Sequence, residues 1–284
     1  MGARTVGKYA LALDPQYGEG RVPVLDGGGR LLRAVRVYRR YSELRAEREA
    51  AGPDERASAP DSGSADVSSS AGSMMTYWDA RTVLAGLGLP FNEAVVVRSA
   101  DEAVASAEAM GYPVTLKVSS DRIVHKAKAG GATTFLLNGS DVAREADRLM
   151  AMFEGPPGAG EGVVVEQFVA ARFEAFVGAR RDPEFGVMVL WGLGGGYAEE
   201  FRDIACLPWP APPSRLNRFL GQTHFGRVLA EAQPDTIPRI RELILALGDA
   251  IAAHVDWVSV DLNPLLITAH GECYFVDARI ERRS

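Results

Sequence analysis

One histidine of this chain lies among residues that are suited to handling phosphate. The segment "VSSDRIVHKAKAGGAT", residues 118–133, places His125 beside Lys126 and Lys128 and shortly before two glycines. A neutral imidazole nitrogen is nucleophilic near neutral pH, and the two lysines would favour a phosphorylated histidine through charge attraction. The alternative is a polar hairpin connection in which the glycines make the turn. The residues alone leave both interpretations open.

A lysine and a glycine run could supply phosphate contacts elsewhere in the chain. Lys117 lies inside the apolar strand pattern "PVTLKV", where a lysine either extends its stem to water or meets an anion. Residues 191–196, "WGLGGG", follow a strand pattern, and glycines there let main-chain N–H groups approach phosphate oxygens closely. The run is not a Walker A loop and lacks the spacing of the dinucleotide-binding fingerprint. An edge-strand lysine and a simple strand-to-strand turn are the alternatives.

The C-terminal region contains two polar clusters that end strand patterns. "DLNP" contributes Asp261 and Asn263, and "VDAR" contributes Asp277 and Arg279. Asn263 and Asp277 are fourteen positions apart (277 − 263 = 14), with a turn expected near residues 270–271. This spacing can bring the two side chains together on paired strands, and two oxygen ligands suit Mg²⁺, which keeps water and phosphate oxygens in its shell. A polar-edged hairpin with a turn-forming Asn-Pro is the alternative.

The elements that must position these residues alternate between helix and strand patterns. Helices are expected over 76–87, 99–110, 140–153 and 236–254, the second opening on a capping box formed by Ser99 and Glu102. Strands are expected over 94–98, 112–118, 132–137, 163–169, 173–181, 186–195, 258–268 and 272–280, and residues 208–213 must be extended or looped. Hairpins mixed with crossover helices indicate an α/β or α+β architecture rather than a clean doubly wound sheet.

Composition divides the chain and limits its function. Residues 51–73 contain one valine and no other large apolar side chain, which predicts a flexible linker between an N-terminal piece, 1–50, and a body, 74–284. Of the 284 residues, 47% are hydrophobic and 24% charged, and the net charge of −6 does not favour a nucleic-acid partner. We find no membrane-spanning run, no signal-peptide pattern and no metal or disulfide spacing of the two cysteines, and we therefore expect a cytoplasmic protein.

Taken in order, the motifs of the body resemble the ATP-grasp module of ADP-forming acyl-CoA synthetases, which are related to succinyl-CoA synthetase. The resemblance runs from about Tyr77 to Arg279. It is carried by "GLGLPF", "GYPVTLKV", "IVHKAKAGG", "EGVVVEQFV", "FEAFVGARRDPEFG", "WGLGGGYAEEFRD", "VDLNPLL" and "VDARI". It implies an ATP-grasp fold of two α/β subdomains, preceded by a short helical piece and a disordered linker. It also implies ATP and Mg²⁺ as ligands.

The resemblance assigns roles to single positions. It implies that Lys117 contacts nucleotide phosphates, that Glu174 binds the ribose, and that the main chain near Glu166 and Phe168 lines the adenine pocket. It implies that Asn263 and Asp277 hold magnesium. The remaining positions implied are His125 as transient phosphate acceptor, Asp261 as the group that steadies it, and Gly194, Gly195 and Arg279 as part of the nucleotide site.

The chain also departs from the family pattern. The family loop usually reads "HK-S-D-x-GG", whereas this chain has Ala127 and Lys128. An arginine expected after "RD" is replaced by the segment that contains Leu207, and "GQTHFGRV" replaces a "G-x-R-G" loop. These losses would weaken phosphate contacts or reshape the acceptor side of the site, and so alter or degrade the activity. Residues 1–50 look like the tail of a preceding CoA-ligase module whose CoA-binding domain is absent, which implies a separate CoA-binding partner subunit.

Two classes of function therefore stay open. The first is the nucleotide-binding subunit of an ADP-forming acid–CoA ligase, which passes phosphate between ATP and an acyl phosphate through His125. Its partner would supply CoA and the carboxylic acid. The second is a non-catalytic, degenerate ATP-grasp-like module with a binding, assembly or regulatory role. A free-standing ATP-grasp ligase that forms an amide leaves the His125 loop without a role.

Overall fold

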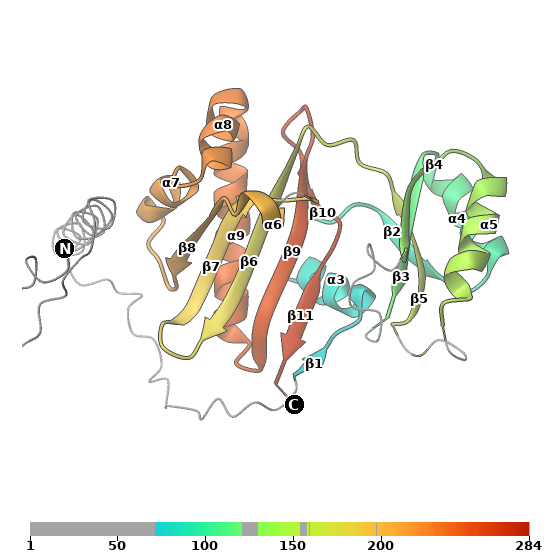
Figure 1. Cartoon of the computed structure of the whole chain (residues 1–284), viewed down its shortest axis with the longest axis horizontal. Helices are drawn as coiled ribbons and strands as arrows, with labels where there is room; N and C mark the ends of the chain where they lie inside the picture. The colour runs from blue at the N-terminus through green and yellow to red at the C-terminus, as the bar shows by residue number, and fades with distance from the viewer. Residues whose placement is uncertain (1–71, 121–129, 154–157, 159, 197, 284) are drawn as a thin grey trace, which may run out of the picture. The chain divides into compact units, whose positions relative to one another are not determined.

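The computed structural model of the chain describes residues 72–120, 130–153, 158, 160–196 and 198–283 (Figure 1). These residues all belong to one compact unit. The predicted N-terminal piece, most of the predicted linker and the loop with His125, Lys126 and Lys128 lie outside the described residues. Ser73, the last position of the predicted linker, belongs to a strand.

The smaller of two antiparallel sheets has four strands in the order β2-β5-β3-β4. Its elements are β2 (Ala94–Val97), α4 (Ala100–Met110), β3 (Val114–Ser119), β4 (Ala132–Leu136), α5 (Gly139–Met150) and β5 (Gly162–Gln167). Helices α4 and α5 cover one face of this sheet (Figure 1). Beneath them lies a core to which β3 and β5 contribute alternate valines and leucines. The alternation of residues along β3 and β5 therefore reflects a sheet with one face covered by helices, while the opposite face can carry polar side chains.

The larger sheet has seven strands, six of them in the order β1-β11-β9-β6-β7-β8, with β10 also paired to β9. Its strands are β1 (Ser73–Met74), β6 (Phe173–Asp182), β7 (Gly186–Leu193), β8 (Ile204–Pro208), β9 (Trp257–Ile267), β10 (Cys273–Phe275) and β11 (Arg279–Arg282). The helical elements of this part are α3 (Tyr77–Gly86), α6 (Ala198–Phe201), α7 (Ser214–Leu220), α8 (His224–Ala232), η1 (Pro234–Thr236) and α9 (Ile237–Ala253).

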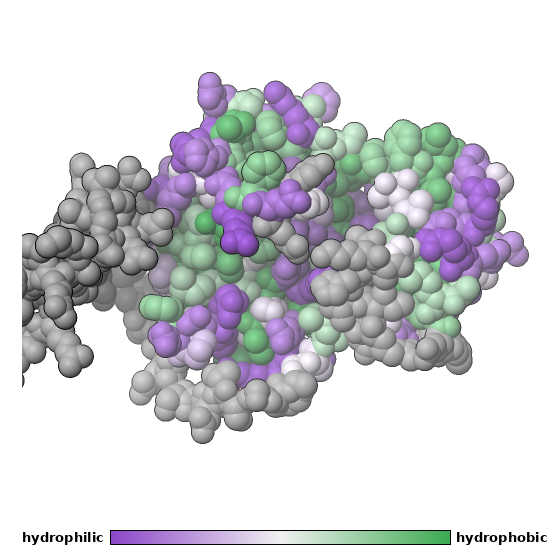
Figure 2. Space-filling view, viewed as in Figure 1, coloured by the Kyte–Doolittle hydropathy of each residue, from purple (hydrophilic) through white to green (hydrophobic). Residues whose placement is uncertain are grey.

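Helix α9 lies along one face of the larger sheet, against β6, β7 and β9 (Figure 1). Its buried side chains recur at helical spacing, among them Ile240, Leu243, Ile244 and Leu247, and they join the main core. Helix α5 shows the same division on the smaller sheet. The buried residues of α5 are Val142, Ala146 and Leu149, and hydrophilic residues cover its outer surface (Figure 2).

The structure confirms the predicted mixed α/β fold and most of its elements. The Ser99 side chain accepts a hydrogen bond from Glu102 N, as the capping box predicts. Helix α5 ends at Met150, earlier than the predicted 153. Strand β8 and helices α7 and α8 were not predicted, because β8 is short and directly followed by a proline-rich segment that dominates the local pattern. In the described part of the chain, no helix is long and apolar enough to cross a membrane.

The contact between α9 and the Trp209 indole yields a stability prediction. A Cβ added at Gly248 would lie 2.5 Å from the Trp209 Cδ2 and Cε2 atoms. We expect Gly248→Ala to lower the free energy of unfolding by about 1–3 kcal/mol, because the buried ring must shift. Gly86→Ala is the matched control, since nothing lies within 4 Å of its added Cβ. Urea denaturation should show an unchanged or slightly more stable Gly86→Ala protein, and equal behaviour of the two variants would contradict the prediction.

Candidate functional site

Lys117 lies on the face of β3 that is turned away from α4 and α5. Its neighbours Leu116 and Val118 are fully buried in the core under those helices, so strand alternation places Lys117 on the opposite face. Strand β3 is flanked by β5 and β4, which excludes an edge-strand position. Lys117 Nζ lies 2.8 Å from Glu166 Oε2 and donates a hydrogen bond to Val276 O at 2.5 Å. The lysine therefore meets an anion, one of the two outcomes predicted for it.

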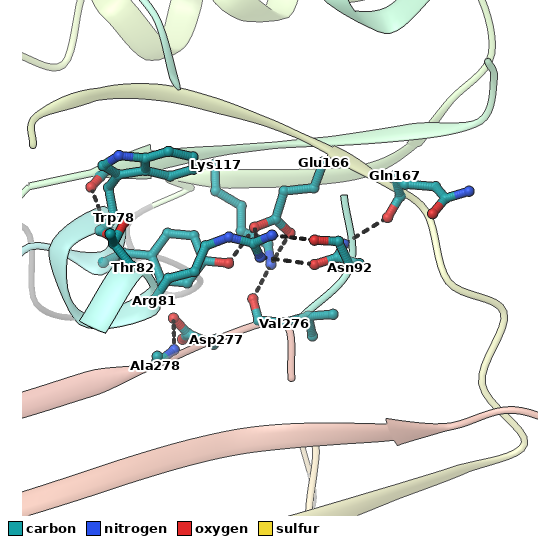
Figure 3. A network of polar contacts seen from close by, with 12 residues as sticks. Trp78, Arg81, Thr82, Asn92, Lys117, Glu166, Gln167, Val276, Asp277 and Ala278 are labelled. Atoms are coloured by element: carbon teal, nitrogen blue, oxygen red, sulfur yellow. Dashed lines mark hydrogen bonds and ion pairs between the residues drawn. The ribbon is translucent and has the colours of Figure 1, made fainter. Parts of the chain in front are cut away.

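Glu166 is the centre of a buried polar network (Figure 3). Its side chain is 1% exposed and accepts a hydrogen bond from the Tyr77 hydroxyl, while Arg81 Nη1 lies 3.9 Å from Glu166 Oε1. Burial raises the pKa of the Tyr77 hydroxyl well above its ordinary value, and the negative charge of Glu166 raises it further. The hydroxyl therefore stays protonated and donates its hydrogen bond. Arg81 also donates to Asn92 Oδ1 at 3.1 Å. One carboxylate thus stands between two cations.

The C-terminal hairpin brings Asn263 and Asp277 opposite each other. The pairs Phe275↔Leu265 and Arg279↔Asp261 share one register (275 + 265 = 279 + 261 = 540), and Asn263 with Asp277 falls midway between them with the same sum. The register therefore agrees with the predicted pairing of these two positions, and their role as magnesium ligands stays a prediction. Both groups offer oxygen atoms, which fits the donor chemistry that Mg²⁺ prefers. Within the described residues there is no group of three or more His, Cys, Asp or Glu that could hold a metal without further ligands.

The glycine run approaches both Asn263 and Glu174. Gly195 N donates to Asn263 Oδ1 at 2.9 Å, and Gly194 N donates to Glu174 O at 2.9 Å. Gly195 has a φ of 76°, and a Cβ there would lie 1.9 Å from Glu174 Oε2. Only glycine fits this position without displacing the glutamate. The Glu174 residue itself is exposed, which leaves it accessible to a ligand.

Asp261 and Arg279 lie opposite each other on β9 and β11, next to this group. Arg279 Nη2 is 4.0 Å from Asp277 Oδ2. Partial desolvation by the surrounding protein raises the pKa of the Asp261 carboxyl above its ordinary value, although the residue still contacts solvent. The Arg279 guanidinium acts in the opposite direction, and the Asp277 carboxylate adds to the increase. An arginine between two carboxylates reduces their repulsion and keeps them available as acceptors.

Hydrogen bonds and strand register thus relate most of the predicted site residues to one another. Lys117 bonds to the carbonyl next to Asp277, Asp277 is opposite Asn263, and Asn263 accepts from the glycine run beside Glu174. Phe168 lies just beyond β5, with its ring edge-on to another phenylalanine. His125 is outside the described residues, so its position relative to this group stays a prediction.

Sequence reasoning missed the side-chain role of Glu166 and its partners. Tyr77 and Arg81 are four positions apart on α3, a spacing that places both on one helix face, and this was the available signal. Glu166 follows three valines in a buried strand, and a carboxylate at such a position needs a cationic partner. The sequence alone does not show which cationic side chain is the partner of Glu166.

The chain is similar to proteins of one family. The model of a family described as ATP-grasp domain matches residues 66–281. The beta subunit of acetate–CoA ligase (ADP-forming) I from Pyrococcus furiosus is 30% identical over 208 residues, which is 71% of this chain and 89% of that subunit. The acetate–CoA ligase (ADP-forming) I of Archaeoglobus fulgidus is 31% identical over 202 residues, 66% of this chain but 29% of that protein. The chain therefore spans under a third of the length of this relative.

Solved structures of a third relative have the same fold. The dinucleotide-forming acetyl-coenzyme A synthetase 1 of Ca. Korarchaeum cryptofilum, in complex with coenzyme A and Ca-AMPCP, is 26% identical and superposes with a TM-score of 0.66, covering 74% of this chain and 94% of that chain. Another structure of that synthetase, with coenzyme A and Mg-AMPPCP, is 25% identical with a TM-score of 0.62 and coverages of 74% and 93%. It is described as having a phosphohistidine segment that points towards the nucleotide binding site.

The buried ion pair yields a prediction about stability. We expect Lys117→Met and Glu166→Gln each to destabilise the fold by about 3–5 kcal/mol, because each leaves its partner charged and buried. The double variant should cost less than the sum of the two, with a coupling of about 1–3 kcal/mol between them. Denaturant unfolding of the wild type, both single variants and the double variant measures this coupling. Additive costs would show that the two side chains do not interact.

Proposed function

The chain belongs to the family of ATP-grasp domains, and from this premise we propose that it is the nucleotide-binding subunit of an ADP-forming acyl-CoA synthetase. It would transfer a phosphoryl group between ATP and an acyl phosphate through His125. A separate subunit would supply the CoA-binding and CoA-ligase functions. The observation that carries the proposal is the group formed by Lys117, Asn263, Asp277 and the glycine run, which combines a cation, two side chains with oxygen atoms and main-chain donors.

Each component of this group suits one part of a Mg-nucleotide. Lys117 supplies positive charge for the phosphates, as does Arg279 beside the carboxylates. Asn263 and Asp277 would hold Mg²⁺, which when bound neutralises charge on the phosphate oxygens. Glu174, exposed beside the glycine run, would accept a hydrogen bond from a ribose hydroxyl. Phosphoryl transfer depends mainly on such positioning and charge neutralisation.

The acceptor is proposed from the sequence around His125. In the transfer, the imidazole nitrogen would form a bond to the γ-phosphorus while the bond from that phosphorus to the ADP oxygen breaks, so ADP leaves with the electron pair. The reverse transfer returns the phosphoryl group. The phosphohistidine segment described for the Korarchaeum synthetase supports this assignment by analogy. Asp261, whose raised pKa reflects its desolvated surroundings, would steady the histidine through a hydrogen bond.

The proposal of a partner subunit is supported by the names and lengths of the relatives. The chain covers 89% of a protein named as a beta subunit but 29% of a longer ligase. We propose that a second chain carries the CoA site, that the acyl phosphate or carboxylic acid and CoA reach this chain through that partner, and that the assembly acts in the cytoplasm. The alternative, a non-catalytic ATP-grasp-like module, is favoured by the departures at Lys128 and Leu207.

Nucleotide binding is tested with two variants that break the same ion pair. Mg-ATP at one hundred times its Kd should stabilise the wild type by about 2.7 kcal/mol, which corresponds to a rise in melting temperature of roughly 5–10 °C. Lys117→Met should abolish most of this rise, because it removes the cation that contacts the phosphates. Glu166→Gln is the comparison variant: it breaks the same pair but keeps Lys117 and its bond to Val276 O, so it should retain more of the rise than Lys117→Met. A wild-type melting temperature that ignores millimolar Mg-ATP would overturn the nucleotide assignment.

Phosphoryl transfer is tested with γ-labelled ATP and Mg²⁺, with the partner subunit present. The wild type should acquire acid-labile, base-stable label, whereas His125→Ala and His125→Asn should acquire none, because neither side chain can carry the phosphate. ATP affinity should stay within a few-fold in both variants. His270→Ala, which removes an exposed histidine in the β9–β10 turn, is the control and should label normally. Normal labelling of His125→Ala excludes the mechanism, and an unlabelled wild type that still binds ATP favours the non-catalytic module.

A further inference from the structure

Phe135 is an exposed aromatic residue in a backbone conformation that side chains disfavour. Its φ is 65°, and in the described part of the chain only Arg202 is another non-glycine residue with positive φ. The Phe135 residue is 55% exposed, so burial of its own ring does not compensate for this conformation. Backbone outliers of this kind concentrate at functional sites, where the surrounding structure holds them.

The conformation of Phe135 belongs to a β-bulge that aims the ring. In the β3–β4 register, Val114 pairs with Leu136 and Leu116 pairs with Thr133. Two residues of β4, 134 and 135, therefore lie opposite one residue of β3, Thr115 (136 − 133 − 1 = 2 against 116 − 114 − 1 = 1). A bulge of this type redirects a side chain, and bulges are frequent next to active sites.

The bulge directs Phe135 to the face of the sheet that carries the candidate site. Leu136 joins the core under α4 and α5, and the Thr133 hydroxyl bonds to Glu145 Oε1 on α5 at 2.5 Å, so both face the helices. Phe135 precedes Leu136 and consequently lies on the other face, as do Lys117 and Glu166. Thr115 is two residues from Lys117, which places Phe135 roughly 7 Å along the strand from the lysine.

Phe135 is paired there with a second aromatic ring. The ring centroids of Phe135 and Phe168 are 5.1 Å apart at an interplanar angle of 75°, an edge-to-face contact. Phe168 is held by its main chain, since its N–H donates to Pro113 O at 3.2 Å. The two rings form a small apolar surface beside a cationic and hydrogen-bonding region. A nucleotide is divided in the same way, with a flat base at one end and a charged phosphate chain at the other. The ribose between them spans a distance similar to that between the two rings and Lys117.

The resemblance already implies a base pocket at the Phe168 main chain; we infer that the Phe135 ring, together with the Phe168 ring, forms an aromatic platform in that pocket and sets the affinity for the base. The inference rests on the proposed nucleotide site and adds a determinant for its base. Aromatic rings bind bases through their π faces with little dependence on hydrogen bonding, so the platform contributes affinity for a purine rather than strict discrimination between purines.

The test is Phe135→Gly in the full chain, assayed by calorimetry with Mg-ATP and with Mg-tripolyphosphate, which lacks a base. Glycine adopts positive φ readily, so the melting temperature of the ligand-free variant should not fall. ATP affinity should fall on the order of tenfold, whereas tripolyphosphate affinity should stay within about twofold. Phe135→Tyr, which keeps the ring, should retain ATP affinity. Phe185→Gly removes another exposed ring, in the β6–β7 turn, and should change neither affinity.

The outcomes separate this inference from the proposed function. A wild type that binds ATP, together with a Phe135→Gly protein of equal ATP affinity, overturns the platform alone. Equal losses for ATP and tripolyphosphate also overturn it, since they would show a general disturbance of the site. A wild type that binds neither ligand overturns the nucleotide site and the platform with it.

Discussion

The buried carboxylate of Glu166 is the interaction on which the rest of the site depends. A carboxylate that is 1% exposed must be neutralised and hydrogen-bonded, and Lys117, Arg81 and the Tyr77 hydroxyl together meet this need. These partners come from β3 and α3, so satisfying one charge fixes a helix against the smaller sheet. Lys117 then uses another proton to bond the carbonyl of Val276. The ion pair with Glu166 consequently helps to fix the position of the Lys117 ammonium group relative to Asp277.

The register of the C-terminal hairpin is the second constraint. One register relates Leu265 to Phe275 and Asp261 to Arg279, so Asn263 and Asp277 cannot be separated without shifting both neighbouring pairs. A shift by one residue would also turn buried side chains such as Leu265 and Phe275 to the opposite face. The apolar core thereby keeps the two polar residues together, because a register shift that separated them would also expose buried side chains.

Much of this arrangement could be predicted from sequence, and the rest could not for identifiable reasons. Strand alternation located Lys117, and the spacing of Asn263 and Asp277 predicted their pairing, because both signals are local or depend on one hairpin. The contact between Lys117 and Val276 joins residues 159 positions apart and has no local signature. The bulge at Phe135 could not be predicted from the sequence, because a left-handed backbone conformation is usually occupied by glycine and not by phenylalanine. His125 stays a sequence-based hypothesis.

The family departures acquire a structural meaning in β8 and α8. Leu207 is 7% exposed and packs in the main core from β8, so the segment that lacks the family arginine stabilises the sheet instead. The segment that lacks the "G-x-R-G" loop begins α8, where Thr223 accepts from Gly226 N and a Cβ at Gly226 would lie 1.9 Å from Leu220 O. The first replacement adds no cation, and the cation of the second, Arg227, donates hydrogen bonds to the Gly221 and Gln222 carbonyls of its own turn. The proposed phosphate contacts therefore rest on Lys117, Arg279 and the glycine-run amides, and a site with so few cations would need Mg²⁺ to neutralise a triphosphate.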